Sequence, residues 1–137
     1  MTAIETAPST GTERAEATAA LAIGEVAERT STTVDTLRYY ERIGLIEVGR
    51  DAGGRRAYTD HDVRRVVFLT RMRQSEMPIR DLQRYVELVN EGPHTAPERL
   101  ALMESHREAV RRRQTELAAA LAVIDFKITA YGGTCGA

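Results

Sequence analysis

Four side chains within five residues, Arg38, Tyr39, Tyr40 and Arg42, carry groups that bind nucleic acids. Arginine holds phosphate oxygens and can read the edge of a guanine, and the tyrosine hydroxyl can donate a hydrogen bond to phosphate. A second group of the same residue types follows, made up of Arg50, Arg55, Arg56 and Tyr58. Together the two groups predict a surface that contacts DNA.

The first group lies on a short helix that we predict over Val34–Ile43. Thr33 stands where its hydroxyl can accept a hydrogen bond from a free amide of the first turn. Gly44 suits the left-handed residue that ends a helix, and an extended apolar pair, Leu45-Ile46, follows it. A helix that displays arginine and tyrosine so densely suits insertion into a groove of DNA.

A second, shorter helix is predicted before it, over Gly24–Arg29. Ile23, Val26 and Ala27 follow the spacing of an amphipathic helix, and the polar residues 30–32 separate the two helices. Two short helices joined by a turn of three to four residues have the outline of a helix-turn-helix motif. An ordinary pair of packed helices has the same spacing, so spacing alone leaves both interpretations open.

A hairpin is predicted directly after this motif. Two extended pieces, Leu45–Val48 and Arg55–Tyr58, flank Gly53-Gly54, where glycine can adopt the positive φ of a tight turn. A hairpin with arginines at its tip resembles a wing that lies along a phosphate backbone. The alternative interpretation is a solvated turn. We favour the wing because the hairpin directly follows the candidate DNA-binding helix.

Two further helices are predicted to support the motif. Thr59 can cap the first of them, with two aspartates in its positive first turn. Pro78 interrupts the helical pattern, and the second helix ends around Gly92. We therefore expect a winged helix-turn-helix DNA-binding domain over residues 21–92, preceded by a disordered leader, rich in Thr, Ala and Glu, over residues 1–20.

A long helix is predicted over residues 95–131, with a flexible tail over residues 132–137. Thr95 and Glu98 have the spacing of a capping box, with a proline between them. Positions then recur every three and four residues, which is the period of a coiled-coil seam. This seam stripe consists of Leu100, Met103, Val110, Leu117, Leu121, Ile124, Ile128 and Tyr131, with the polar Arg107 and Gln114 between them. No equally long helix is predicted in the chain, so we expect a homodimer; packing on the chain's own helices is the alternative.

Composition argues against several other classes of protein. The 137 residues contain no apolar run of membrane-spanning length and no signal pattern, so we expect a cytoplasmic protein with no membrane contact. Cys135 is the single cysteine, either a reactive thiol or an ordinary tail residue. One thiolate cannot build a metal site unless two chains share it, so we expect no metal and no cofactor. We find no paired carboxylates, nucleophile–base set or phosphate loop, so we expect no enzyme.

The net charge of −1 is low for a DNA-binding protein, although three glutamates among the first twenty residues lower it.

Three segments together resemble the MerR family of transcriptional regulators. They are Ile-Gly-Glu-Val-Ala at 23–27, Thr-Leu-Arg-Tyr-Tyr-Glu-Arg-Ile-Gly-Leu-Ile at 36–46 and Arg-Arg-Ala-Tyr at 55–58, followed by the helix from Asp60. The resemblance covers roughly residues 21–131. It implies a mainly α fold, in which a winged helix-turn-helix domain precedes a long dimerisation helix that forms an antiparallel coiled coil. It also implies a homodimer that binds a near-palindromic operator in double-stranded DNA and distorts the promoter spacer for RNA polymerase.

The resemblance assigns roles to individual residues as well. Arg38 and Tyr39 are the expected groove contacts, whereas Tyr40 and Arg42 are expected in packing or phosphate contact, and the wing residues are expected to hold the backbone. The full set of expected DNA-binding residues is Thr33, Val34, Arg38, Tyr39, Tyr40, Arg42, Arg55, Arg56 and Tyr58. Two alternatives stay open, an architectural, excisionase-like DNA-binding protein and a coiled-coil adaptor without transcriptional activity.

Overall fold

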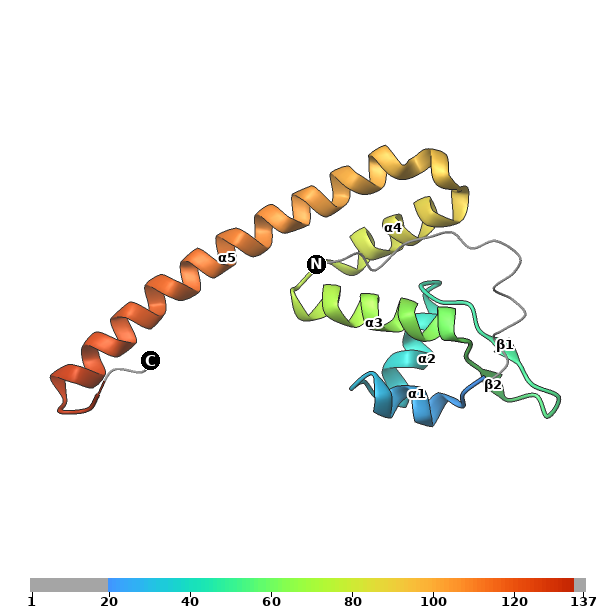
Figure 1. The fold of residues 1–137 in the computed structure, drawn as a ribbon, viewed down its shortest axis with the longest axis horizontal. Coiled ribbons are helices and arrows are strands. Elements are labelled where there is room, and N and C mark those ends of the chain that lie inside the picture. The colour runs from blue at the N-terminus through green and yellow to red at the C-terminus, as the bar shows by residue number, and fades with distance from the viewer. Residues whose placement is uncertain (1–19, 135–137) are drawn as a thin grey trace. The chain divides into compact units, whose positions relative to one another are not determined.

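Helices and one short hairpin make up the described chain. The computed structural model describes residues 20–134, so residues 1–19 of the predicted leader and residues 135–137 of the predicted tail lie outside the described residues. In chain order the elements are α1 (Ile23–Arg29), α2 (Val34–Arg42), β1 (Gly49–Arg50), β2 (Arg56–Ala57), α3 (Asp60–Gln74), α4 (Ile79–Glu91), the 3-10 turn η2 (Pro93–Thr95) and α5 (Ala96–Ala130). Figure 1 labels the α-helices and the strands. The chain divides into two compact units after Gln83, within α4. The predicted mainly α fold with a small wing is confirmed.

The helix-turn-helix outline is present in the first unit, where α1 and α2 pack against each other. Val26 of α1 and Leu37 of α2 are fully buried. Thr30 is buried in the turn between the helices, and its hydroxyl donates a hydrogen bond to the Val26 carbonyl at 2.7 Å. Ser31 then takes a left-handed φ of 58°, which turns the chain toward α2. The polar break predicted between the two helices is therefore confirmed.

The signals predicted at both ends of α2 are also present, although the helix ends at Arg42, one residue before the predicted Ile43. The Thr33 hydroxyl accepts a hydrogen bond from the Thr36 amide at 3.0 Å. Gly44 takes a φ of +85° beyond the last helical residue, in the region that favours glycine. On the C-terminal side, Gln83 of α4 donates from Nε2 to the Ile43 carbonyl at 3.1 Å. Because caps hold both ends and another helix holds one of them, α2 is a fixed platform for its exposed side chains.

The wing is an antiparallel hairpin whose strands are two residues long. The ladder pairs Gly49 with Ala57 and Arg50 with Arg56. The second strand lies within the predicted extended piece, but the predicted first strand, Leu45–Val48, is wrong because pairing begins only after it. The first two residues of that segment are buried in the core, so they serve packing instead of the ladder.

The junction after the wing follows local capping rules. The Thr59 hydroxyl accepts from the Asp62 amide at 3.1 Å, and the Asp62 carboxylate accepts from the Thr59 amide at 2.9 Å, which completes a capping box for α3. The helix ends before Pro78, as predicted. Met77 is buried, and its carbonyl accepts a hydrogen bond from Arg73 Nη1 at 2.6 Å. The break between α3 and α4 is thus an ordered corner.

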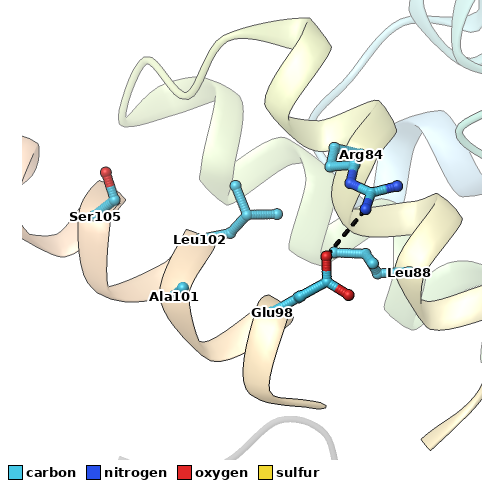
Figure 2. A pocket seen from close by; sticks show the side chains of 6 residues that line it. All are labelled: Arg84, Leu88, Glu98, Ala101, Leu102 and Ser105. Atoms are coloured by element: carbon cyan, nitrogen blue, oxygen red, sulfur yellow. Dashed lines mark hydrogen bonds and ion pairs between the residues drawn. The ribbon is translucent and has the colours of Figure 1, made fainter. Parts of the chain in front are cut away.

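In the second unit, the capping box predicted at the start of α5 is wrong. Thr95 caps no amide of α5. It is buried, and its hydroxyl lies 2.6 Å from the carbonyl of Leu88 in α4 and 2.8 Å from that of Gly92, the residue after this helix. Glu98 does not complete the box either. Glu98 instead pairs with Arg84 of α4, as Figure 2 shows. Its Oε2 lies 3.1 Å from Nη2 of Arg84. The two side chains therefore join helices instead of capping one.

We expect Thr95→Val to destabilise this turn. The substitution keeps the shape of the side chain but leaves the buried Leu88 carbonyl without its donor, at a cost of about 1–3 kcal/mol in the free energy of unfolding. Urea denaturation measures the change. Thr95→Ser retains the hydroxyl and should lose clearly less; an equal loss in both variants would show that the lost hydrogen bond is not the cause.

The long helix α5 ends before Gly132, which takes a φ of +92°, as predicted. Its large apolar side chains are exposed in the single chain: Leu100 by 58%, Leu117 and Leu121 by 57% each, and Ile124 by 52%. No residue of α5 is fully buried. Within residues 20–134, no helix combines the length and the apolar character needed to cross a bilayer. Most of the large apolar side chains of the seam stripe are therefore exposed in this chain, whereas Met103 and Val110 are half-buried.

Candidate nucleic-acid interface

The helix α2 separates a buried face from an exposed one. Leu37 and Tyr40 are buried, whereas Arg38, Tyr39 and Arg42 are exposed. The Arg42 guanidinium lies 5.5 Å from the centre of the Tyr39 ring, within the range of a cation–π contact. This contact limits the freedom of two long side chains before any partner arrives. The exposed side of α2 therefore presents two guanidinium groups and a phenol in a confined area.

Tyr40 takes the packing role of the two roles expected for it. Its side chain is only 5% exposed, and its ring centre lies 6.3 Å from that of Tyr39. Burial raises the pKa of Tyr40, and the positive charge of Arg73 opposes this only in part. The phenol packs behind the exposed side of α2.

The wing-surface position expected for Tyr58 is wrong. The side chain is fully buried, and the backbone amide and carbonyl of Tyr58 pair with those of Leu21 at 2.8 Å each. A ring without exposed surface cannot reach a phosphate, so Tyr58 is a core residue at the base of the wing. Its hydroxyl is buried and has no hydrogen-bond partner among residues 20–134. Burial raises the pKa of Tyr58, and the nearby Glu41 carboxylate raises it further.

The tip of the wing is organised by Asp51, a residue that sequence reasoning did not select. Its carboxylate accepts hydrogen bonds from the amides of Gly53 at 2.8 Å and Arg55 at 2.9 Å. Gly54 takes a φ of +84°, as the tight turn requires. An aspartate just before a glycine pair is the local signal that could have identified this turn. Arg50 and Arg55 flank the turn, and both are exposed.

We expect the ordering of the wing tip to depend on pH in the acid range. The amide of Arg55, followed by that of Gly53, holds the pKa of the Asp51 carboxyl below its usual value. Because the folded-state pKa is depressed, the ionised Asp51 carboxylate stabilises the turn fully above the unfolded pKa of about 4. This stabilisation is lost as the pH falls through the folded-state pKa. The Gly53 and Arg55 amides should therefore lose their protection from hydrogen exchange, after correction for intrinsic rates, as the pH falls below about 4. Asp51→Asn should remove this pH dependence; its persistence in the variant would assign it to another group.

Arg56 lies in the wing but is engaged within the protein. Its Nε donates to Oε1 of Glu41 at 2.5 Å, and the two side chains are only 25% and 23% exposed. Glu41 stands in the last turn of α2, so this ion pair joins the wing to that helix. Sequence reasoning missed Glu41, and the only signal was an opposite charge fifteen positions away, which does not single out a partner.

The remaining expected contacts lie at the start of α2. Thr33 is exposed, although its hydroxyl already serves the cap and also donates to Thr36 Oγ1 at 2.9 Å. Val34 is half-buried. Backbone amides at the beginning of a helix favour anions because of the helix dipole. The first unit therefore carries the start of α2, its exposed arginines and the wing tip, while Tyr40 and Tyr58 support them from inside.

Among residues 20–134, no group of three or more His, Cys, Asp or Glu side chains could hold a metal ion.

The chain is similar in sequence to known regulatory proteins. Residues 21–88 match the family described as MerR HTH family regulatory proteins. An uncharacterized HTH-type transcriptional regulator from Haemophilus influenzae is 32% identical over 108 residues, which are 78% of this chain and 80% of that protein.

Solved structures agree with the sequence comparison. HiNmlR, a MerR family regulator lacking the sensor domain and bound to promoter DNA, aligns with a TM-score of 0.76 and 31% identity, over 82% of this chain and 90% of its own. A MerR family transcriptional regulator from Bacillus thuringiensis aligns with a TM-score of 0.75 and 26% identity, over 82% and 99%. The likeness extends beyond the helix-turn-helix segment to most of the chain.

Proposed function

This chain belongs to the MerR family of helix-turn-helix regulatory proteins, and we propose that it regulates transcription by binding promoter DNA. The observation that carries the proposal is the exposure of Arg38, Tyr39 and Arg42 on one side of α2, in the same unit as the wing arginines Arg50 and Arg55. In this role α2 enters the major groove and the wing tip holds the phosphate backbone. Phosphate contacts position the protein, and a few side chains read bases.

We further propose that two copies act together through α5. The seam stripe places large apolar side chains at the surface, and a helix with such a stripe gains stability by burying it against a similar helix. Arg107 and Gln114 are polar positions in the stripe, which lower stability but fix register and orientation. An antiparallel pairing gives a two-fold axis. Two identical α2 helices then meet two half-sites on one face of a near-palindromic duplex.

The proposed mechanism includes distortion of the bound DNA. Bending or untwisting a short site costs on the order of 1–6 kcal/mol, which contacts from two α2 helices and two wings can offset. A distorted promoter spacer changes the relative placement of the two elements that RNA polymerase recognises. A dimer that stays on its operator can thus repress or activate by changing the shape of the DNA. The bacterial cytoplasm, where promoters are accessible, is the proposed site of action.

Footprinting on the DNA upstream of the protein's own gene tests this function. We expect a symmetric protected site, weaker binding at higher salt because phosphate contacts release counterions, and enhanced cleavage near the centre where the duplex is distorted. Transcription from the same fragment should change when the protein is added. A protected site without any effect on transcription would favour an architectural role, and salt-independent or absent binding would exclude DNA regulation.

A further inference from the structure

We propose that Glu41 and Arg56 form a positioning pair, which fixes the wing relative to α2 for DNA binding; the inference rests on the proposed function. The pair joins residues fifteen positions apart, at the end of α2 and in β2. Arg56 Nε and Glu41 Oε1 are 2.5 Å apart, and about three quarters of each side chain is covered. A charge-assisted hydrogen bond of this kind resists exchange with water more than an exposed ion pair does.

The wing needs such a tie because its own ladder is very short. Each strand has two residues, and an isolated two-stranded hairpin is at best marginally stable in water. The backbone bridge between Leu21 and Tyr58 holds only the base of the wing. The positioning pair adds a second fixed point at Arg56, on the tip side of this bridge, which would restrain the hairpin from pivoting about its base.

The register of the ladder shows which side chains the tie would control. Arg50 lies directly opposite Arg56, and Arg55 precedes Arg56 in the chain. These are the exposed arginines that flank the turn. If Arg56 is held at a set distance from α2, Arg50 and Arg55 are held with it. The separation between the groove-facing side chains of α2 and the phosphate-facing side chains of the wing is then built in before DNA binds, which lowers the cost of ordering.

The charges support the same role. An unpaired Glu41 carboxylate on the helix proposed to enter the groove would repel phosphate, and Arg56 neutralises it. Arg56 is in turn committed to Glu41. Its role is therefore to position the wing, whereas Arg50 and Arg55 remain exposed for phosphate.

The variant Glu41→Gln distinguishes a positioning role from a simple charge effect, because the two predict different changes in the affinity for duplex DNA. If Arg56 contacts phosphate directly, removing a negative charge nearby should leave duplex affinity unchanged or increase it. If the pair positions the wing, the same variant should bind about tenfold more weakly, because a charge-assisted hydrogen bond is lost. Glu47→Gln is the matched control, since Glu47 is exposed and takes part in none of the ion pairs shown for residues 20–134. It makes the same charge change and should not weaken binding.

A double-mutant cycle with Arg55→Ala separates positioning from general loss of structure. Arg55→Ala should weaken binding in the wild-type background and weaken it much less in the Glu41→Gln background, because a mobile wing no longer presents Arg55 well. If Glu41→Gln acts only by unfolding a fraction of the protein, Arg55→Ala keeps its full effect in both backgrounds, which overturns the proposal.

Binding is measured by fluorescence anisotropy with a labelled duplex carrying the footprinted site, and hydrogen exchange of residues 49–57 is measured in the free protein. Faster exchange in Glu41→Gln than in Glu47→Gln is expected. Unchanged or tighter binding by Glu41→Gln would overturn the positioning role. Failure of the wild-type protein to bind any duplex would remove the proposed function, and the positioning role with it, while the exchange data would still report whether the pair restrains the wing.

Discussion

Arg38→Ala is expected to abolish specific DNA binding at concentrations where the wild-type protein saturates its operator. Arg38 is exposed on α2 and is the first arginine of the group proposed to face the groove. A bidentate contact between arginine and a base is worth about 1–3 kcal/mol. A dimer loses the contact twice, so about 2 kcal/mol per copy corresponds to roughly a thousandfold loss of affinity. Gel-shift titration on the footprinted site measures it.

The matched control for this prediction is Arg112→Ala. Arg112 is an exposed arginine of α5 that lies outside the seam stripe, so its loss changes the net charge by the same amount without touching α2 or the wing. We expect it to bind DNA nearly as the wild type does. Equal losses for both variants would mean that binding depends on overall charge. A loss confined to Arg38→Ala, with unchanged thermal unfolding, would place the contact on α2.

Leu121→Glu is expected to convert the protein into a monomer and, as a consequence, to remove operator binding. Leu121 belongs to the seam stripe and is 57% exposed in the single chain, and in the proposed dimer the partner helix buries it. Losing the burial of one leucine costs about 2–5 kcal/mol, and a carboxylate in the seam adds a desolvation penalty. The dimer dissociation constant should therefore rise roughly a hundredfold or more. Sedimentation equilibrium measures the change.

Val123→Glu is the control for this variant. Val123 is 60% exposed and lies two residues further along α5, which is a rotation of about 200° around the helix axis. The substitution introduces the same charge away from the seam stripe, and we expect the dimer to persist. If both variants dissociate equally, the contact surface is not the predicted stripe. If neither dissociates, α5 is not the dimerisation element.

Local rules were sufficient for most of the helix boundaries. Thr33 and Thr59 cap the following helices, and Gly44 and Pro78 end or interrupt the preceding ones, because these effects involve backbone groups only a few residues away. The period of the seam stripe is equally local. A regular spacing of apolar residues over many turns predicts a long helix before any contact is known, and α5 is continuous over Ala96–Ala130.

The local rules failed where a residue could also make a contact with a distant part of the chain. Thr95 has the residue type and spacing of a cap, yet its hydroxyl bonds to the end of α4. Leu45 and Ile46, at the start of the predicted first wing strand, are buried in the core, and strand pairing begins only at Gly49. In both cases a competing contact from a neighbouring element outweighed the local preference, and the local sequence carries no measure of that competition.

The sequence by itself determined the class of the protein, the order of its elements and the segments that carry arginine and tyrosine. Only the tertiary structure decided which of those side chains face outward. Tyr39 is exposed while Tyr40 and Tyr58 are buried, and Arg55 is exposed while Arg56 pairs with Glu41. The physical reason is that tyrosine and arginine combine an apolar body with a polar end, so they suit either surface or interior. Their placement depends on which distant segments pack beside them, and that information exists only in the folded chain.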